Sequence, residues 1–320
     1  MFSTSLNGLM HPSFVSGFID AEGCFSIGII DCSAVKTSSR LKSKWDVRPE
    51  FKIELNEQDL SLLENIKEFF GGKGTISKVG QKVIYRVRSL KDLIEILPHF
   101  DENPLITQKR IDLELLKQVI NLMVNKEHLT YEGLLKILSI KASMNKGLSE
   151  KLKKAFPDIK PVPRLNFENK EAISPNWLAG FTTGEGCFLI DIYNAKTNVG
   201  KGVTLRFSLA QHIRDEKLMK SLVEYFNCGN YYSKSSQPVG DFIIKRFSDI
   251  TDKLIPFFEK YPLQGSKVKN YEDFKKVVEL MKEGTHLTNK GLDEIMKIKS
   301  GMNRGRDNSL VKESLETKIE

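Results

Sequence analysis

The feature that most constrains this chain is a long internal repeat. Residues 12–30 read PSFVSGFIDAEGCFSIGII, and residues 175–193 read PNWLAGFTTGEGCFLIDIY, with glycine, glutamate and phenylalanine at matching places. Later blocks agree as well, since NKEHLTYEGLLKILSIKASMNKG at 125–147 matches KEGTHLTNKGLDEIMKIKSGMNRG at 282–305. A repeat of this length indicates a duplicated domain rather than a stack of short structural repeats.

Two pseudo-equivalent domains are therefore expected, at residues 1–148 and 175–320. The intervening residues 149–174 contain three prolines, many charges and little periodicity. Such a composition predicts an extended linker. The length of 320 residues also exceeds that of a common single domain.

Each half opens with a helical pattern, at residues 14–21 and 177–184, that stops near a glycine and is followed by an alternating strand pattern. In a strand, successive side chains point to opposite faces. The expected buried sets are Phe25, Ile27 and Ile29 in the first half and Phe188, Ile190 and Ile192 in the second. The expected open sets are Cys24, Ser26 and Gly28, and Cys187, Leu189, Asp191 and Tyr193. One face of each sheet is thus left for a partner.

The remaining pattern of each half is a charged loop, a strand, an amphipathic helix, glycine turns, two short strands and trailing helices. The strands are expected at 50–55 and 206–211, and the amphipathic helices at 59–70 and 215–226. Helices at about 92–100, 107–124 and 130–143 complete the first half, with Thr130 and its counterpart Thr288 as N-caps. The fold class is α+β, with the order α-β-β-α-β-β-α in each half.

The charge balance suits a polyanionic partner. There are 49 Lys and Arg against 41 Asp and Glu, a net charge of +8. A merely solvated lysine-rich surface is the alternative explanation. Four cysteines show neither CxxC spacing nor a nearby His partner, which argues against a zinc site or a disulfide framework and favours a reducing compartment. No apolar run reaches the length of a membrane helix and no signal peptide is visible, so no membrane partner is expected.

Small residues four apart give each first helix a stripe along which two helix backbones can approach, at Gly17 and Ala21 and at Gly180 and Gly184. If these helices pack together, Glu22 and Glu185 come close to each other. Two adjacent carboxylates repel unless a cation lies between them, and Mg²⁺ fits such a place. An isolated glutamate at a helix end is usually solvated, but its recurrence in a matching context favours a metal ligand.

The segments FVSGFIDAEG and WLAGFTTGEG resemble the signature of the LAGLIDADG family, degenerate but present twice and followed both times by a CF pair. The resemblance extends over nearly the whole chain, and the blocks ITQKR, EHLTYEG and IKASMNKG are similar to the fungal mitochondrial intron-encoded, single-chain branch. The resemblance implies a monomeric homing endonuclease in mitochondria. It also implies two domains whose curved antiparallel sheets form a DNA-binding saddle, and a staggered double-strand break across the minor groove with 3′ overhangs.

The resemblance assigns metal binding to Glu22 and Glu185, with Ala21 and Gly184 beside them as further ligands. The expected cofactor is Mg²⁺, with Mn²⁺ as a substitute and Ca²⁺ binding without supporting cleavage. In phosphodiester hydrolysis such metals orient a water molecule, polarise the scissile phosphate and stabilise the leaving 3′ oxygen.

Other residues near the motif have weaker assignments. Asp20 occupies the earlier acidic position of the motif, but its counterpart is Thr183, so we expect Asp20 to be structural. Lys109 and Lys267 stand where the family places a basic residue near the scissile phosphate, with a surface lysine as the alternative. Gln211 ends a strand that should run toward the centre, so it is expected either to orient the attacking water or to contact a base.

The strand faces and charged loops are expected to contact DNA, with arginines reading guanines and most lysines contacting phosphates. The first half supplies Ser26, Gly28, Ile30, Lys36, Arg40, Lys44, Arg48, Lys73, Lys78, Arg86 and Arg88. The second half supplies Asp191, Tyr193, Lys196, Lys201, Arg206, Ser208, Tyr232, Lys234, Lys245 and Arg246. Strand length predicts a double-stranded target of roughly 18–20 base pairs. Since the two contact sets differ, the target should be asymmetric.

Two other functions remain open on the sequence. Proteins of this fold can assist splicing, so an intron maturase that binds host intron RNA is the closest alternative, although retention of both glutamates favours cleavage. A DNA-binding regulator without catalysis is the other.

Overall fold

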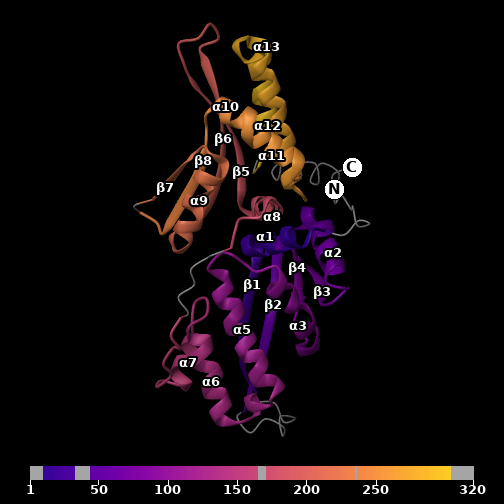
Figure 1. Cartoon of the computed structure of the whole chain (residues 1–320), viewed down its shortest axis with the longest axis vertical. Helices are drawn as coiled ribbons and strands as arrows, with labels where there is room; N and C mark the ends of the chain where they lie inside the picture. Colours follow the sequence, from indigo (N-terminus) through magenta and orange to yellow (C-terminus); the bar gives the residue numbers. More distant parts are fainter. Residues whose placement is uncertain (1–9, 33–43, 165–170, 235, 304–320) are drawn as a thin grey trace, which may run out of the picture. The chain divides into compact units, whose positions relative to one another are not determined.

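The computed structural model describes residues 10–32, 44–164, 171–234 and 236–303. The chain divides into two compact units, Met1–Trp177 and Leu178–Glu320 (Figure 1). The boundary falls inside the helix α8 (Pro175–Glu185), close to the predicted start of the second repeat.

Unit 1 has the predicted order of elements. They are α1 (Pro12–Glu22), β1 (Gly23–Asp31), β2 (Trp45–Asn56), η1 (Glu57–Asp59), α2 (Leu60–Phe69), β3 (Thr75–Val79), β4 (Lys82–Val87), α3 (Leu90–Ile96), α4 (Pro98–Glu102), α5 (Lys109–Val124), η2 (Glu127–Leu129), α6 (Tyr131–Ala142) and α7 (Glu150–Ala155). The four strands form one antiparallel sheet in the order β1-β2-β4-β3. The α+β fold class is therefore confirmed in this unit.

Unit 2 repeats this arrangement after α8. Its elements are β5 (Gly186–Asn194), β6 (Lys201–His212), η3 (Ile213–Asp215), α9 (Glu216–Phe226), β7 (Asn230–Ser233), β8 (Val239–Ile244), α10 (Phe247–Asp249), the π-helix η4 (Ile250–Leu254), α11 (Ile255–Lys260), α12 (Lys267–Lys282), η5 (Thr285–Leu287) and α13 (Asn289–Ser300). The sheet order β5-β6-β8-β7 is the same as that of unit 1.

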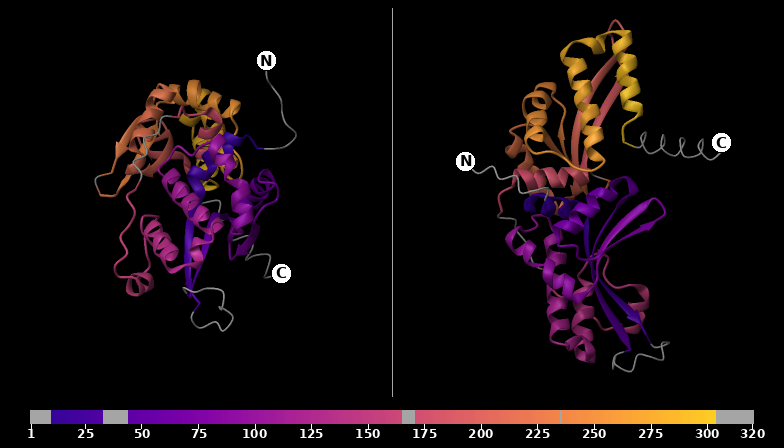
Figure 2. Two further views of the ribbon diagram at one scale, coloured as in Figure 1. Left: turned by 60° about the horizontal axis from the view of Figure 1, so that its bottom comes forward. Right: turned by 90° about the vertical axis from the view of Figure 1, so that its right-hand side faces the viewer.

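Each sheet buries the predicted face against helices, except that Ile29 and Ile192, at the far ends of their strands, are only half-buried. In unit 1, Phe25 stacks on Phe51 at a ring-centroid distance of 5.0 Å, and Phe100 of α4 meets both rings edge-on. The helices α5 and α6 run side by side next to the long strands (Figure 2). Burying such rings stabilises the unit by removing large apolar surfaces from water. The opposite face keeps Cys24, Ser26 and Gly28 partly exposed, as expected.

Unit 2 contains the same aromatic core. Phe188 and Phe207 lie 5.2 Å apart between ring centroids, and Phe258 of α11 contacts both. The helices α12 and α13 lie side by side, with α12 against β5 (Figure 2). Since these three phenylalanines take the places of Phe25, Phe51 and Phe100, the repeat preserves its core as well as its chain path.

Three local predictions can be compared with the structure. The capping role of Thr130 and Thr288 is confirmed, because their side chains accept hydrogen bonds from the amides of Gly133 and Gly291. The strands β2 and β6 begin earlier than expected, inside the predicted charged loops. Their first residues alternate with charged side chains, so this part of each strand was read as loop. The predicted linker is not wholly extended, because α7 forms there and buries Leu152.

The π-helix η4 marks an insertion. Ser89 and Arg246 are equivalent N-cap positions, yet Pro98 follows nine residues after the first and Pro256 ten residues after the second. A π-helical turn accommodates one extra residue without breaking the helix. Of the helices in the part of the chain that the structure describes, none is long and apolar enough to cross a membrane.

Candidate functional site

Each glutamate of the repeat is the last residue of its unit's first helix. Glu22 ends α1 and Glu185 ends α8, and both are half-buried. Glycine must follow, because a Cβ at Gly23 would lie 2.7 Å from the carbonyl oxygen of Ile19 and one at Gly186 would lie 2.5 Å from that of Thr182. The Glu-Gly pair therefore lets the chain turn directly from helix to strand beside the carboxylate.

A lysine ammonium group binds the end of each of these helices. Lys109 Nζ donates hydrogen bonds to the carbonyl oxygens of Ile19 and Ala21 at 3.0 and 2.9 Å. Lys267 Nζ donates to those of Gly184 and Gly186 at 3.2 and 2.5 Å. Lys109 is the first residue of α5 and Lys267 is the first residue of α12, so the lysine has the equivalent position in each unit. The structure thus brings each lysine next to its glutamate.

These helix ends have the chemistry of a divalent-cation site. A helix C-terminus carries a partial negative charge on its last carbonyl groups, and a carboxylate adds a full charge beside them. Oxygen donors of this kind are what Mg²⁺ and Ca²⁺ prefer. The carbonyls of Ala21 and Gly184 already bind a cationic group in each unit, which shows that they face a place where positive charge is favoured. The residues present therefore fit a metal ion. No cluster of three or more His, Cys, Asp or Glu side chains with metal-binding geometry occurs among the described residues.

Asp20 anchors its helix to the loop before α5, as its expected structural role requires. It is buried and accepts hydrogen bonds from the amides of Ile106 and Thr107 at 2.9 and 3.3 Å, and from Trp177 Nε1 at 2.8 Å. The Thr107 hydroxyl donates to it as well, at 2.5 Å. Burial raises the pKa of Asp20 to about 6, and the hydrogen bonds oppose that rise. The carboxylate is thus fully engaged inside the protein.

Gln211 lies at the end of the sheet that carries Glu185. β6 pairs Leu209 with Gly186, and Gln211 follows two residues later. Its side-chain oxygen accepts a hydrogen bond from the His212 amide at 3.0 Å. The equivalent residue of unit 1 is Leu55, which has no polar group, so any role of Gln211 is confined to unit 2.

The open face of the unit 1 sheet has its basic side chains paired with acids. Glu50 lies at its centre, opposite Ser26, and Arg88 Nε contacts it at 2.5 Å while Arg86 Nε lies 3.8 Å away. Arg48, opposite Gly28, pairs with Asp46 at 2.7 Å. The expected contacts Ser26, Gly28, Ile30, Arg48, Arg86 and Arg88 thus share one face. Lys44 is exposed just before β2, and Lys73 pairs with Glu95 in the glycine turn.

The open face of the unit 2 sheet carries Asp191, Tyr193, Arg206, Ser208 and Tyr232, as expected. Arg206 lies 3.8 Å from Asp191, and Lys234 pairs with Asp241 at 2.9 Å. Lys196 is exposed in the β5–β6 turn.

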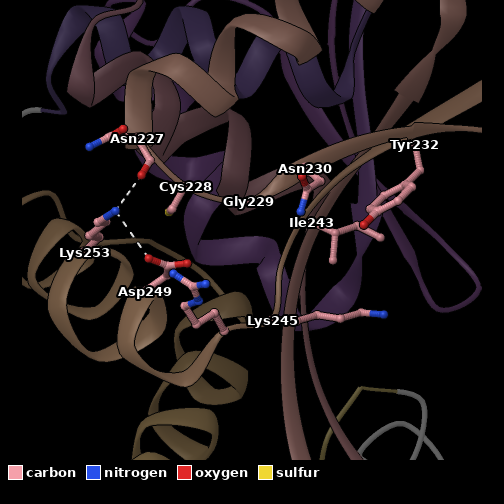
Figure 3. A pocket seen from close by; sticks show the side chains of 10 residues that line it. Asn227, Cys228, Gly229, Asn230, Tyr232, Ile243, Lys245, Asp249 and Lys253 are labelled. Atoms are coloured by element: carbon pink, nitrogen blue, oxygen red, sulfur yellow. Dashed lines mark hydrogen bonds and ion pairs between the residues drawn. The ribbon is translucent and has the colours of Figure 1, made fainter.

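Lys245 and Arg246, which follow β8, line a pocket of about 350 Å³ in unit 2. One wall is held by Lys253 of η4, whose Nζ donates to the Asn227 carbonyl at 2.5 Å and pairs with Asp249 at 3.3 Å (Figure 3). The Lys245 and Tyr232 side chains extend away from that pair (Figure 3). The pocket therefore offers basic groups that are not consumed by the Lys253 contacts.

The structure does not bring every predicted contact to these faces. Lys78 points to the same side of β3 as Ile76 and pairs with Glu57. Lys201 points to the same side of β6 as Val203 and donates to Asn194 at 2.6 Å. Both lie on the side of the helix-covered face because side chains alternate along a strand. Lys36 and Arg40 lie outside the described residues.

Sequence reasoning missed several side chains on the open faces. Lys52 and Glu54 follow Glu50 by alternation on β2, and Thr204 precedes Arg206 on β6. Phe51 and Phe207 face the helices, so the residues that alternate with them on β2 and β6 must face the open side, and this rule would have found all three. They were missed because the alternation of side chains was not followed along β2 and β6.

Comparison with known proteins agrees with this geometry. The LAGLIDADG endonuclease family matches residues 15–120 and 178–278. "Probable intron-encoded endonuclease 2" of Neurospora crassa is 41% identical over 306 residues, which cover 92% of this chain and 65% of that relative's length. The chain thus spans less than two thirds of that relative.

Two solved structures of the I-SmaMI LAGLIDADG homing endonuclease are also similar. One is bound to cleaved DNA and has a TM-score of 0.89 at 44% identity, over 94% of this chain and 99% of that chain. The other is bound to an uncleaved DNA target in the presence of calcium ions and has a TM-score of 0.88 at 44% identity, over 92% and 99%. Because the family match falls on both repeats and includes the helix-ending glutamate of each, the chain belongs to the LAGLIDADG endonuclease family.

Proposed function

We propose that this chain is a site-specific homing endonuclease that hydrolyses both strands of a long, asymmetric double-stranded DNA target and leaves 3′ overhangs. One observation carries the proposal: in both units a glutamate ends a helix whose neighbouring carbonyl binds a lysine ammonium group. The similarity to I-SmaMI, which has been solved with cleaved DNA, supports it.

Glu22 and Glu185 are the residues that would hold the divalent metal, together with the carbonyl groups of Ala21 and Gly184. Mg²⁺ is the proposed ion, with Mn²⁺ as a substitute. A bound metal supplies Lewis-acid polarisation of the scissile phosphate and lowers the pKa of an attacking water. The calcium-bound I-SmaMI structure with uncleaved DNA supports the proposal that Ca²⁺ binds without cleavage.

Lys109 and Lys267 would act on the substrate through charge. Each ammonium group lies at the helix end beside a glutamate, where negative charge builds up on a scissile phosphate during hydrolysis. A positive group fixed there stabilises that charge more in the transition state than in the bound substrate. Gln211 would orient water or contact a base in unit 2 only.

The open sheet faces would hold the DNA. Arginines and polar residues that point away from the helices can reach base edges, and the lysines beyond the strand ends can reach phosphates. The two faces differ, since Gly28 and Ile30 in unit 1 take the places of Asp191 and Tyr193 in unit 2. We therefore propose a non-palindromic target of roughly 18–20 base pairs, bound by a monomer. A mitochondrial location follows from the resemblance to intron-encoded proteins.

The first test is cleavage of a randomised double-stranded DNA library in Mg²⁺, with Ca²⁺ and chelator in parallel. Recovery of one long asymmetric site with 3′ overhangs, only in Mg²⁺, is the expected result. Absence of any cut site in a deep library, together with tight binding to structured intron RNA, would replace the endonuclease with a maturase.

The second test removes each carboxylate. Glu22→Gln and Glu185→Gln should lower the single-turnover cleavage rate by roughly a thousandfold while leaving DNA affinity in Ca²⁺ within several fold. Glu64→Gln and Glu224→Gln are matched controls, because these exposed glutamates lie on α2 and α9. These control variants lose the same charge and should cleave DNA at the normal rate. If binding falls in step with cleavage in the Glu22 and Glu185 variants, those residues serve the fold or the DNA contact instead.

A further inference from the structure

The repeated Met-Asn pair near the end of each unit has no role in the function proposed so far. It occurs as Met144-Asn145 in SMNKG and as Met302-Asn303 in GMNRG. Both methionines are buried, so they fix the segment after the last long helix against the core. Both asparagines have left-handed backbone conformations, with φ of 45° and 50°. The pair is thus a fixed structural device that presents one amide side chain per unit.

Each asparagine amide holds the strand that leaves the glutamate. Asn145 Nδ2 donates to the carbonyl oxygen of Phe25 at 2.8 Å, and Asn303 Nδ2 donates to that of Phe188 at 3.1 Å. These carbonyls lie three residues after Glu22 and Glu185. β1 and β5 are the outermost strands of their sheets, where a strand edge has carbonyl groups without a partner strand. The amide supplies such a partner close to the carboxylate.

The asparagines are themselves tied to the helix that carries the lysine. The backbone N–H of Asn145 donates to Asp112 Oδ1 at 3.4 Å, and the backbone N–H of Asn303 donates to Asn270 Oδ1 at 3.1 Å. Asp112 follows Lys109 by three residues, as Asn270 follows Lys267, so each pair lies on one face of its helix. One face of α5 is therefore connected to the chain on both sides of Glu22. Lys109 binds the carbonyl of Ala21, and Asn145, which is held by Asp112, binds the carbonyl of Phe25.

We propose that Asn145 and Asn303 are positioning residues, each of which fixes the turn between helix and strand and so the direction of its unit's glutamate. This inference rests on the proposed endonuclease function. A small displacement of a catalytic group lowers the rate strongly, whereas DNA affinity depends on many contacts spread over the sheets. Loss of one amide should thus be visible in the rate before it is visible in binding.

The test uses Asn145→Gly and Asn303→Gly in the full chain. Glycine adopts the left-handed conformation without strain and removes the side chain with its amide, while the backbone N–H stays. Asn145 is exposed and Asn303 is half-buried, so neither change empties the core. Asn227→Gly is the matched control: Asn227 is also left-handed, with φ of 49°, it follows α9, and it binds Lys253 through its backbone carbonyl, which glycine retains. Asn145→Asp and Asn303→Asp are second variants that keep the shape and replace the amide donor with a carboxylate.

The readout is the single-turnover rate for each DNA strand, measured with two different end labels well below the melting temperature. Each glycine variant should slow cleavage roughly tenfold, with the larger loss on one strand, and the two variants should favour opposite strands. Kd in Ca²⁺ should stay within about threefold, and Asn227→Gly should change neither quantity. A merely structural role would lower the melting temperature and slow both strands equally or not at all, and either result overturns the inference.

A parallel reaction with Glu22→Gln separates the two proposals. If Glu22→Gln cleaves normally, the endonuclease site itself has been misassigned. If Glu22→Gln is inactive but the asparagine variants cleave both strands at the normal rate, only the positioning role fails.

Discussion

In unit 1 the residue two positions before the glutamate is the buried acid Asp20, whereas the equivalent residue of unit 2 is Thr183. Asp20 accepts the amides of Ile106 and Thr107, and the Thr183 hydroxyl accepts the amide of Gln264, which is the counterpart of Ile106. Thr183 also donates to the carbonyl of Ala179 at 2.9 Å. A carboxylate in unit 1 and a hydroxyl in unit 2 thus bind the equivalent loop to the equivalent helix.

Further pairs of equivalent residues differ in the same way. Asp112 supports Asn145, but Asn270 supports Asn303. His99 of α4 packs edge-on against Phe69 and Phe70, where Phe257 of α11 packs against Tyr225 and Phe226. By contrast, the glutamate, the glycine after it, the lysine and the Met-Asn pair are the same in both units. The supporting groups thus differ between the units while each keeps a hydrogen bond or a ring contact at its place, whereas the groups at the helix end are unchanged.

The largest expected difference between the units is the loss of stability when Asp20 or its counterpart Thr183 is replaced. Asp20→Ala leaves several buried donors without an acceptor, including Trp177 Nε1, and should lower the free energy of unfolding by about 3–5 kcal/mol. Thr183→Ala removes one accepted bond and should cost about 1 kcal/mol. Denaturant unfolding of the two variants measures this directly. Equal costs would mean that the carboxylate is no more deeply integrated than the hydroxyl.

Protonation of His99 should weaken unit 1 in acid, whereas Asp20, whose pKa burial raises to about 6, contributes in the opposite direction. Burial lowers the pKa of His99 to about 4 from 6.5, and its Nε2 lies 3.0 Å from the Ser16 hydroxyl. The folded state then binds fewer protons than the unfolded state between these values. The stabilisation is complete above pH 6.5 and is lost as the pH falls toward 4, by at most about 3 kcal/mol at about 1.4 kcal/mol per pH unit.

The variant His99→Phe copies unit 2 and should remove the His99 contribution, so that the variant loses less stability in acid than the original protein. The measurement is the free energy of unfolding of both proteins from pH 7 to pH 4.5. Parallel curves for the two proteins would show that other groups cause the acid sensitivity.

A smaller effect is expected from exchanging the supports of the two asparagines. Asp112→Asn keeps an oxygen for the backbone N–H of Asn145 but loses the charge that pairs with Arg164 at 3.4 Å. It should lower stability by about 1 kcal/mol and leave the ratio of strand cleavage rates unchanged. Thermal melting and the two-label cleavage assay check the two parts. A changed strand ratio would mean that the negative charge, rather than the acceptor oxygen, supports the asparagine.

The elements, and the place of each glutamate at a helix end, could be predicted because each depends on a local pattern that occurs twice. Helix periodicity, strand alternation and the Glu-Gly turn can be read in both copies. The contacts of Asn145 with Phe25 and of Lys109 with Ala21 join residues far apart in the chain, and no local pattern encodes them. Lys78 and Lys201 were expected on the open faces for another reason. They were chosen for their charge, without asking to which side of the strand each side chain points. The length of β2 was underestimated because its first residues resemble a charged loop.

The smallest expected effect concerns the acid at the centre of the unit 1 face. Glu50 pairs with Arg86 and Arg88, while the equivalent residue of unit 2 is Arg206, which pairs with Asp191. Glu50→Gln should release both arginines toward phosphate and raise DNA affinity about threefold, because exposed ion pairs of this kind contribute less than about 1 kcal/mol. The slope of log Kd against log salt should steepen by about 1.

Anisotropy titrations from low to moderate salt, in Ca²⁺, measure both quantities. Glu64→Gln removes the same charge from α2, away from the open face, and should leave the slope unchanged, since only a charge near the phosphates alters counterion release. If Glu50→Gln instead weakens binding, Glu50 holds the arginines in the orientation that DNA requires, and the acid in unit 1 is a positioning group rather than a competitor. Asp191→Asn in unit 2 would then be expected to weaken binding for the same reason, so the comparison between the two faces decides which role such acids have.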